Sequence, residues 1–160
     1  MKYCFDTSAL IGLGERHYPE HIPVFTPIWN HLYSEIESDN IVSVDFVKTE
    51  LEEKADDWRE NFLIKADKMF HINNLVEAEY AKVISEIETG AQFLNNRHRT
   101  LFMGGADPWV IALARTLGDC TVISAETKKL ADYGLGEVCK QLDVKHAGLV
   151  KFFEENNIGK

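Results

Sequence analysis

Residues 3–11 of the chain read YCFDTSALI, and this stretch indicates how the fold begins. A short apolar run ends directly at Asp6, and a helix is expected from about Ser8 onward. A strand that passes into a helix at an acidic residue is typical of the carboxyl edge of an open α/β sheet, where ligands gather. The opening stretch therefore predicts both the fold class and a first candidate binding residue.

Short apolar runs continue to alternate with longer helical patterns along the chain, which favours a parallel sheet with helices on its faces. Further strands are expected at residues 41–44, 69–72, 120–123 and 144–146. Apolar residues at helical spacing predict helices at residues 27–38, 108–117 and 148–155. We therefore predict an α/β fold with three layers, α/β/α, around a short central parallel sheet.

Two segments between these elements have a character of their own. Residues 45–98 are acidic and helical and contain little that predicts a strand, so we expect an extended helical middle segment. Residues 12–23 carry Gly14, Pro19 and Pro23, and are expected to form a surface loop.

Length and composition limit the alternatives. The 160 residues, of which 45% are apolar, suit a single domain over residues 1–160. No apolar run approaches the ~20 residues of a membrane span, and the first acid comes too early for a signal peptide, so we expect a cytoplasmic protein. The three cysteines form no C-x-x-C pair, so they indicate reduced thiols and no zinc site.

The charge is unfavourable for a protein that binds nucleic acid by overall attraction. The chain has 17 basic and 26 acidic residues, a net charge of −9. Binding of RNA would therefore depend on bound cations or on local basic groups. Two clusters supply such groups, and their members are candidate RNA contacts: Arg97, Arg99, Lys128 and Lys129.

Three acids lie at the ends of predicted elements. Asp6 follows the first strand, Asp107 precedes Pro108 at the expected start of a helix, and Glu126 comes three residues after the strand at 120–123. Each also has a purely structural explanation. Asp6 and Asp107 could be helix N-caps, and Glu126 could be a first-turn residue favoured by the helix dipole.

Glu50 is the most informative acid, because it lies four residues after Phe46 and three after Val47, on the apolar face of a predicted helix. A carboxylate that faces inward is costly unless it is paired, hydrogen bonded or bound to a metal. The alternative is a rotated helix in which Glu50 reaches solvent beside Lys54. Three or four such acids would suit Mg²⁺, which prefers oxygen ligands and keeps some of its waters.

Four pieces of the sequence together resemble the PIN-domain ribonucleases, many of which are toxins of bacterial toxin and antitoxin pairs. The pieces, in family order, are residues 5–11 (FDTSALI), 47–51 (VKTEL), 106–114 (ADPWVIALA) and 122–126 (VISAE). The nearest likeness is to a less characterised branch with a longer middle segment. The resemblance covers nearly the whole chain and implies a PIN-like fold.

The resemblance also implies roles for single residues and for partners. It makes Asp6, Glu50 and Asp107 ligands of Mg²⁺ or Mn²⁺, with Glu126 in the fourth acidic position, where the family often has aspartate. Thr7, Ser8 and Ser124 become supporting residues behind the ligands. It further implies an RNA substrate, a small antitoxin as partner and a homodimer.

Other enzyme classes fit the sequence less well. A haloacid dehalogenase-like phosphatase would need an aspartate at Ser8, and the Gly104-Gly105 pair lacks the pattern of a nucleotide-binding loop. No histidine has the motif support that a serine or cysteine hydrolase needs. Two alternatives stay open: a PIN-fold nuclease for RNA processing or DNA cleavage without a toxin role, and a noncatalytic PIN-like binding module.

Overall fold

A computed structural model describes residues 1–54, 56–71 and 73–159 of the chain. Within these ranges four parallel strands form one sheet in the order β2-β1-β3-β4. The central pair is formed by β1 (Lys2–Phe5) and β3 (Cys120–Ile123), and the flanking strands are β2 (Ile41–Val42) and β4 (His146–Ala147). The predicted short parallel sheet is confirmed.

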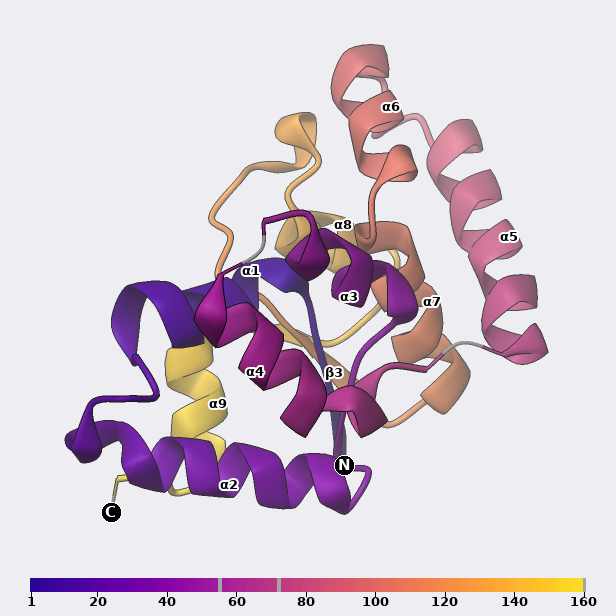
Figure 1. Ribbon diagram of the computed structural model, residues 1–160. Helices are drawn as coiled ribbons and strands as arrows, with labels where there is room; N and C mark the ends of the chain where they lie inside the picture. The colour runs from indigo at the N-terminus through magenta and orange to yellow at the C-terminus, as the bar shows by residue number, and fades with distance from the viewer. Residues whose placement is uncertain (55, 72, 160) are drawn as a thin grey trace.

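The two faces of the sheet are covered by different helices, as the alternation of side chains along β1 shows. Cys4 points toward α7 (Asp107–Leu117), where its sulfur lies 3.8 Å from the Val110 carbonyl oxygen. Tyr3 and Phe5 point the other way, onto Phe152 of α9 (Leu149–Glu155), with ring centroids 4.9 and 5.1 Å away. The predicted three-layer α/β/α architecture is therefore confirmed (Figure 1).

The remaining α-helices extend these layers. They are α1 (Thr7–Ile11), α2 (Thr26–Glu37), α3 (Asp45–Glu52), α4 (Asp57–Lys65), α5 (Asn74–Thr89), α6 (Asn96–Gly104) and α8 (Leu135–Gln141). The helices α3 to α6 form the helical middle segment expected from the sequence. Of these, α5 packs along α7, where Tyr80 stacks on Trp109 with ring centroids 3.7 Å apart.

Residues 12–23 differ from the expected surface loop. Gly12–His17 form a π-helix in which Gly12, Leu13 and Gly14 are buried, and Pro23–Phe25 form a turn of 3₁₀-helix. The indole of Trp58 lies directly on Gly14, so that a Cβ there would be 2.0 Å from the ring. The glycine therefore serves close packing rather than a turn, which local sequence patterns do not reveal.

The weaker predicted strands are shorter than expected or absent. In the segment 69–72, Met69 ends a 3₁₀-helix (Asp67–Met69), Phe70 forms an isolated bridge with Ser43, and Ile72 lies outside the described residues. The last strand is displaced by about two residues, from the expected 144–146 to His146–Ala147. Such short strands have few ladder hydrogen bonds, so their bounds depend on tertiary packing.

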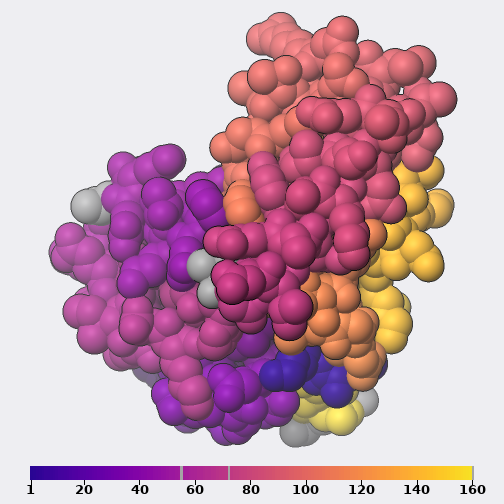
Figure 2. All heavy atoms as spheres, turned by 90° about the vertical axis from the view of Figure 1, so that its right-hand side faces the viewer, coloured from indigo at the N-terminus to yellow at the C-terminus, as the bar shows by residue number. Residues whose placement is uncertain are grey.

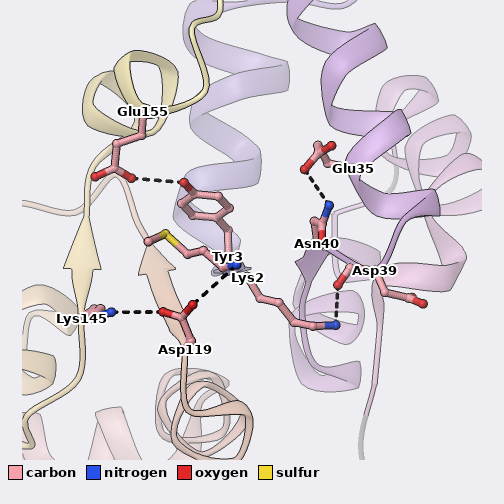
Figure 3. Close-up of polar contacts among 9 residues, drawn as sticks. Lys2, Tyr3, Glu35, Asp39, Asn40, Asp119, Lys145 and Glu155 are labelled. Atoms are coloured by element: carbon pink, nitrogen blue, oxygen red, sulfur yellow. Dashed lines mark hydrogen bonds and ion pairs between the residues drawn. The ribbon is translucent and has the colours of Figure 1, made fainter.

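Because all strands run parallel, the two ends of the sheet form two distinct edges. The carboxyl edge carries the residues that follow β1 and β3, and the acids of the next section lie there. The amino edge carries a set of polar contacts among residues such as Lys2, Asp119 and Lys145 (Figure 3). The three cysteines are buried and unbridged, and no helix among the described residues could span a bilayer.

Candidate metal site

Four carboxylates from separate parts of the chain line one cavity of about 250 Å³. They are Asp6 after β1, Glu50 on α3, Asp107 at the start of α7 and Glu126 after β3. Helix α6 lines another part of the cavity, and Figure 2 shows the unit of α5 and α6 standing out from the molecule with a notch where it meets the α3 and α4 region. The acids predicted to form one site are therefore neighbours in space, and their role as metal ligands stays a prediction.

Asp6 is the N-cap of α1 and has 1% of its surface exposed. Its Oδ1 accepts a hydrogen bond from the Ala9 amide at 2.8 Å, and the Ser8 hydroxyl lies 2.9 Å from both carboxylate oxygens. Burial and the negative charge of Asp107 raise the pKa of Asp6 well above its usual range. The capping role is confirmed, and it leaves lone pairs of the carboxylate for another partner.

Glu50 is half-buried and lines the cavity, and of the two residues that predicted its direction Val47 is buried while Phe46 is 40% exposed. Its Oε1 accepts a hydrogen bond from the Ala106 amide at 3.0 Å, and its Oε2 accepts one from the Thr7 hydroxyl. The rotated helix with Glu50 beside Lys54 is therefore wrong. The two donors also satisfy the inward carboxylate in part, so Glu50 depends less on a cation than the sequence suggests.

Asp107 is the first residue of α7, and Pro108 takes the second position, one later than expected. The N-cap is Ala106, so Asp107 does not have the capping role that was the alternative for it. No described residue donates a hydrogen bond to its carboxylate. Burial, followed by the charges of Glu126 and Glu50, raises the pKa of Asp107 from 3.8 to about 7.

Glu126 lies in an extended segment after β3, so the alternative that it is a first-turn residue of a helix is wrong. Its side chain is 23% exposed, and Lys128 Nζ lies 3.9 Å from its Oε1. Its Oε2 is buried, and the described residues offer it no hydrogen bond. An unpaired buried carboxylate oxygen costs about 1–3 kcal/mol or more, and a cation or a donor that reached this atom would relieve that cost.

Two of the three predicted supporting hydroxyls contact the acids. Thr7 donates to Glu50, and Ser8 donates to Asp6 while accepting a hydrogen bond from the Ala125 amide at 3.0 Å. Ser8 therefore ties the end of β1 to the segment that carries Glu126. The Ser124 hydroxyl instead lies 2.6 Å from His146 Nε2, and Ser124 is outside the set of described residues that line the cavity.

The predicted RNA contacts are spread around the cavity. Lys128 lines it directly beside Glu126. Arg97 and Arg99 lie on α6, where Arg99 donates to the Asn96 side chain at 2.5 Å, and neither is among the described residues that line the cavity. Lys129 follows Lys128 and precedes a 3₁₀-helix at Leu130–Asp132. Contact of these residues with RNA stays a prediction.

The four acids share the cavity without surrounding a common point. Over the described ranges, no group of three or more His, Cys, Asp or Glu side chains is placed to hold a metal ion. Carboxylates repel one another without a cation, and Asp6 and Glu50 are held by donors from the chain. The donor set nevertheless fits Mg²⁺ or Mn²⁺, which take oxygen ligands and keep waters, and the free Oε2 of Glu126 is one such oxygen.

A further part of the cavity wall was not predicted from the sequence. His98 and Phe102 of α6 line it, together with Asp132 and Tyr133. His98 Nδ1 lies 3.2 Å from the Ala131 carbonyl oxygen, which joins α6 to the 3₁₀-helix at Leu130–Asp132. These residues belong to no motif. The one local signal is the pair Tyr133-Gly134, since glycine indicates a turn.

One protein family model matches the chain, over residues 3–159, and its description is "Domain of unknown function (DUF4411)". The chain belongs to this family. No curated protein and no solved structure matches the chain. The DUF4411 match extends from β1 to beyond the end of α9, so all four carboxylates lie within the family's domain. Its description names no activity, and membership of the PIN-domain proteins stays a prediction.

Proposed function

We propose that this member of the DUF4411 family is a nuclease that hydrolyses RNA phosphodiester bonds with Mg²⁺ or Mn²⁺. The observation that carries the proposal is the convergence of four carboxylates on one cavity. Two of them have raised pKa values, and a third has a buried oxygen without a partner. So much negative charge in a small space is costly unless a cation neutralises it.

Each of the four acids has a role in metal binding in this proposal. Asp6, Glu50 and Asp107 hold the metal, and Glu126 completes the cluster with its free Oε2. Thr7 and Ser8 keep Glu50 and Asp6 in place through their hydroxyls. When bound, the cation would lower the pKa of a coordinated water and stabilise the charge that develops on phosphorus.

The charge of the cavity also determines how RNA can enter. Without a cation the carboxylates repel a phosphate, and the net charge of −9 adds to this repulsion. Lys128, which lines the cavity beside Glu126, is the basic residue best placed to receive a phosphate. RNA binding is therefore expected to require the divalent cation as well as local basic groups.

The test is a cleavage assay with the full chain and single-stranded RNA and DNA of one sequence, in Mg²⁺, Mn²⁺ or EDTA. We expect RNA cleavage in either metal, none in EDTA, and at least a hundredfold lower rate in Asp6→Asn. Asparagine is as good an N-cap as aspartate, so this variant should fold normally. The proposal is wrong if the chain cleaves no RNA with either metal, or if Asp6→Asn, prepared in the same way, keeps full activity. Cleavage of DNA alone would favour a DNA nuclease.

The resemblance to toxin-type PIN proteins extends the proposal to the cellular role. In this proposal the chain is a cytoplasmic toxin, forms a homodimer and is silenced by a small antitoxin. Expression of the chain should then arrest bacterial growth, whereas Asp6→Asn should not. RNA cleavage in vitro without growth arrest would favour an RNA-processing nuclease instead.

A further inference from the structure

A tyrosine of the same cavity has a buried hydroxyl without a partner. Tyr133 lines the cavity, has 3% of its surface exposed, and its Oη forms no hydrogen bond with the described residues. Over those residues, Tyr133 Oη and Glu126 Oε2 are the buried side-chain atoms in this condition, and both belong to residues of the acid cavity. Because buried polar atoms in proteins normally have partners, the two atoms together point to a ligand there.

The backbone of Tyr133 is in an unfavourable conformation. Its φ and ψ angles are 52° and 46°, in the left-handed region that disfavours residues with bulky side chains. The other described non-glycine residues with positive φ are aspartate or asparagine, which tolerate this region better. Strain of this kind persists where the surrounding structure enforces it, and it gathers at functional sites.

The surroundings of Tyr133 fix the direction of its ring. The ring packs against Phe93 and Phe102, with centroids 5.8 Å away in both cases. The Tyr133 amide donates to the Leu130 carbonyl at 2.8 Å. Gly134 lies so close to Lys128 that a Cβ would be 2.2 Å from the Lys128 carbonyl oxygen. The turn is therefore locked against the segment that carries Glu126 and Lys128.

We propose that the Tyr133 hydroxyl donates a hydrogen bond to a non-bridging oxygen of the RNA phosphate that enters the acid cavity. This inference rests on the proposed nuclease function. The carboxylates of the cavity repel a phosphate, so a phosphate that enters needs hydrogen-bond donors. The Tyr133 hydroxyl can be such a donor, and it is neutral. Burial raises the pKa of Tyr133, so the hydroxyl keeps its proton at neutral pH.

The variant Tyr133→Phe tests the inference, because it removes the hydroxyl and keeps the ring between Phe93 and Phe102. We expect kcat/KM for single-stranded RNA in Mn²⁺ to fall roughly fivefold to twentyfold, the usual effect of one lost hydrogen bond. The melting temperature should stay the same or rise, since an unpaired buried hydroxyl is removed.

Tyr3→Phe is the matched control, because the Tyr3 hydroxyl donates to Glu155 Oε2 at 3.2 Å, away from the cavity (Figure 3). This variant should keep the wild-type kcat/KM. If wild type cleaves RNA and Tyr133→Phe cleaves it equally well, the inference is wrong while the proposed function stands. A clear drop in the melting temperature of Tyr133→Phe would also overturn it, because the hydroxyl would then have a structural partner. If wild type cleaves no RNA, the proposed function fails and the inference with it.

Discussion

Carboxylates at the two edges of the sheet have pKa values shifted in opposite directions. At the amino edge, Asp119 lies 3.1 Å from Lys145 Nζ and 3.5 Å from the N-terminal ammonium, and these partners lower its pKa (Figure 3). At the carboxyl edge, Asp6 is buried and Asp107 is half-buried, and loss of hydration together with like charge raises their pKa values. Asp119 therefore has two cationic partners, whereas Lys128 is the one lysine among the described residues that line the cavity of the four acids.

This difference separates acids that stabilise the fold from acids that cost stability. The Asp119 contacts are exposed, and exposed ion pairs contribute little to stability but also cost little in desolvation. The carboxyl-edge acids lose hydration and face like charges, which a protein keeps where function needs it. Neutralising one carboxylate should therefore have different effects at the two edges.

The largest effect is expected from the same substitution made at the two edges. Asp107→Asn should lower the rate of Mn²⁺-dependent RNA cleavage at least hundredfold, because it removes a proposed metal ligand. Asp119→Asn should leave the rate within about twofold of wild type, because its contacts lie at the opposite edge. Initial rates at saturating metal measure both. Equal loss in the two variants would contradict a site at the carboxyl edge.

The next effect concerns metal and stability. A cation that binds only the folded chain at a hundred times its Kd should add about 2.7 kcal/mol to the free energy of unfolding. For a domain of this size that corresponds to a rise of roughly 5–10 °C in melting temperature. Thermal unfolding in EDTA and in Mn²⁺ measures it.

Two variants serve as controls for the metal effect. Asp107→Asn should lose most of the stabilisation by Mn²⁺, because one acid of the cavity is neutral. Asp119→Asn should keep it. An identical melting temperature of wild type in Mn²⁺ and EDTA would show that the four carboxylates do not bind the metal.

The fold could be predicted where local pattern and tertiary packing agree. β1 and β3 are apolar runs buried in the sheet, and the stripe of α2 buries Leu32 and Ile36 as its spacing indicated. The π-helix at Gly12–His17 could not be predicted, because Gly14 is required by Trp58, which comes much later in the sequence. Glycine is ambiguous by itself, since it suits both a turn and close packing.

In the candidate site too, the sequence predicts what depends on local pattern and misses what depends on tertiary contacts. Helical spacing relates Glu50 to the buried Val47, but also to Phe46, which is exposed, and the bond of Glu50 to the Ala106 amide joins residues 56 positions apart. The distinction between Asp6 as a cap and Asp107 without a cap depends on where each helix starts, and sequence places helix ends only within a few residues. Tyr133 has no sequence signal, since its importance lies in a missing partner and an unusual φ angle.

The smallest effect is the dependence of stability on pH in EDTA. Asp107, with a pKa raised to about 7, keeps in the folded chain a proton that the unfolded chain loses near pH 4. At Asp107 the folded state therefore binds more protons between about pH 4 and 7, so this carboxyl makes the free energy of unfolding fall as the pH rises through this range. Allowing for partial exposure, the loss from pH 5.5 to 8 should be about 1–2 kcal/mol. Urea unfolding at several pH values measures it.

Asp107→Asn removes this contribution together with the part of the Asp6 pKa shift that the Asp107 charge causes, while His146 acts in the opposite direction. Burial lowers the pKa of His146, so the unfolded chain binds its proton more readily, and stability rises with pH up to about 6.5. That term is common to wild type and Asp107→Asn and cancels in the difference between their curves. The difference should grow from pH 5 to about 7 and then level off, and saturating Mn²⁺ should remove the fall in wild type by keeping the acids ionised. Parallel curves of wild type and Asp107→Asn in EDTA would mean that ionisation of Asp107 does not destabilise the folded chain. The contrast between the two edges would then disappear.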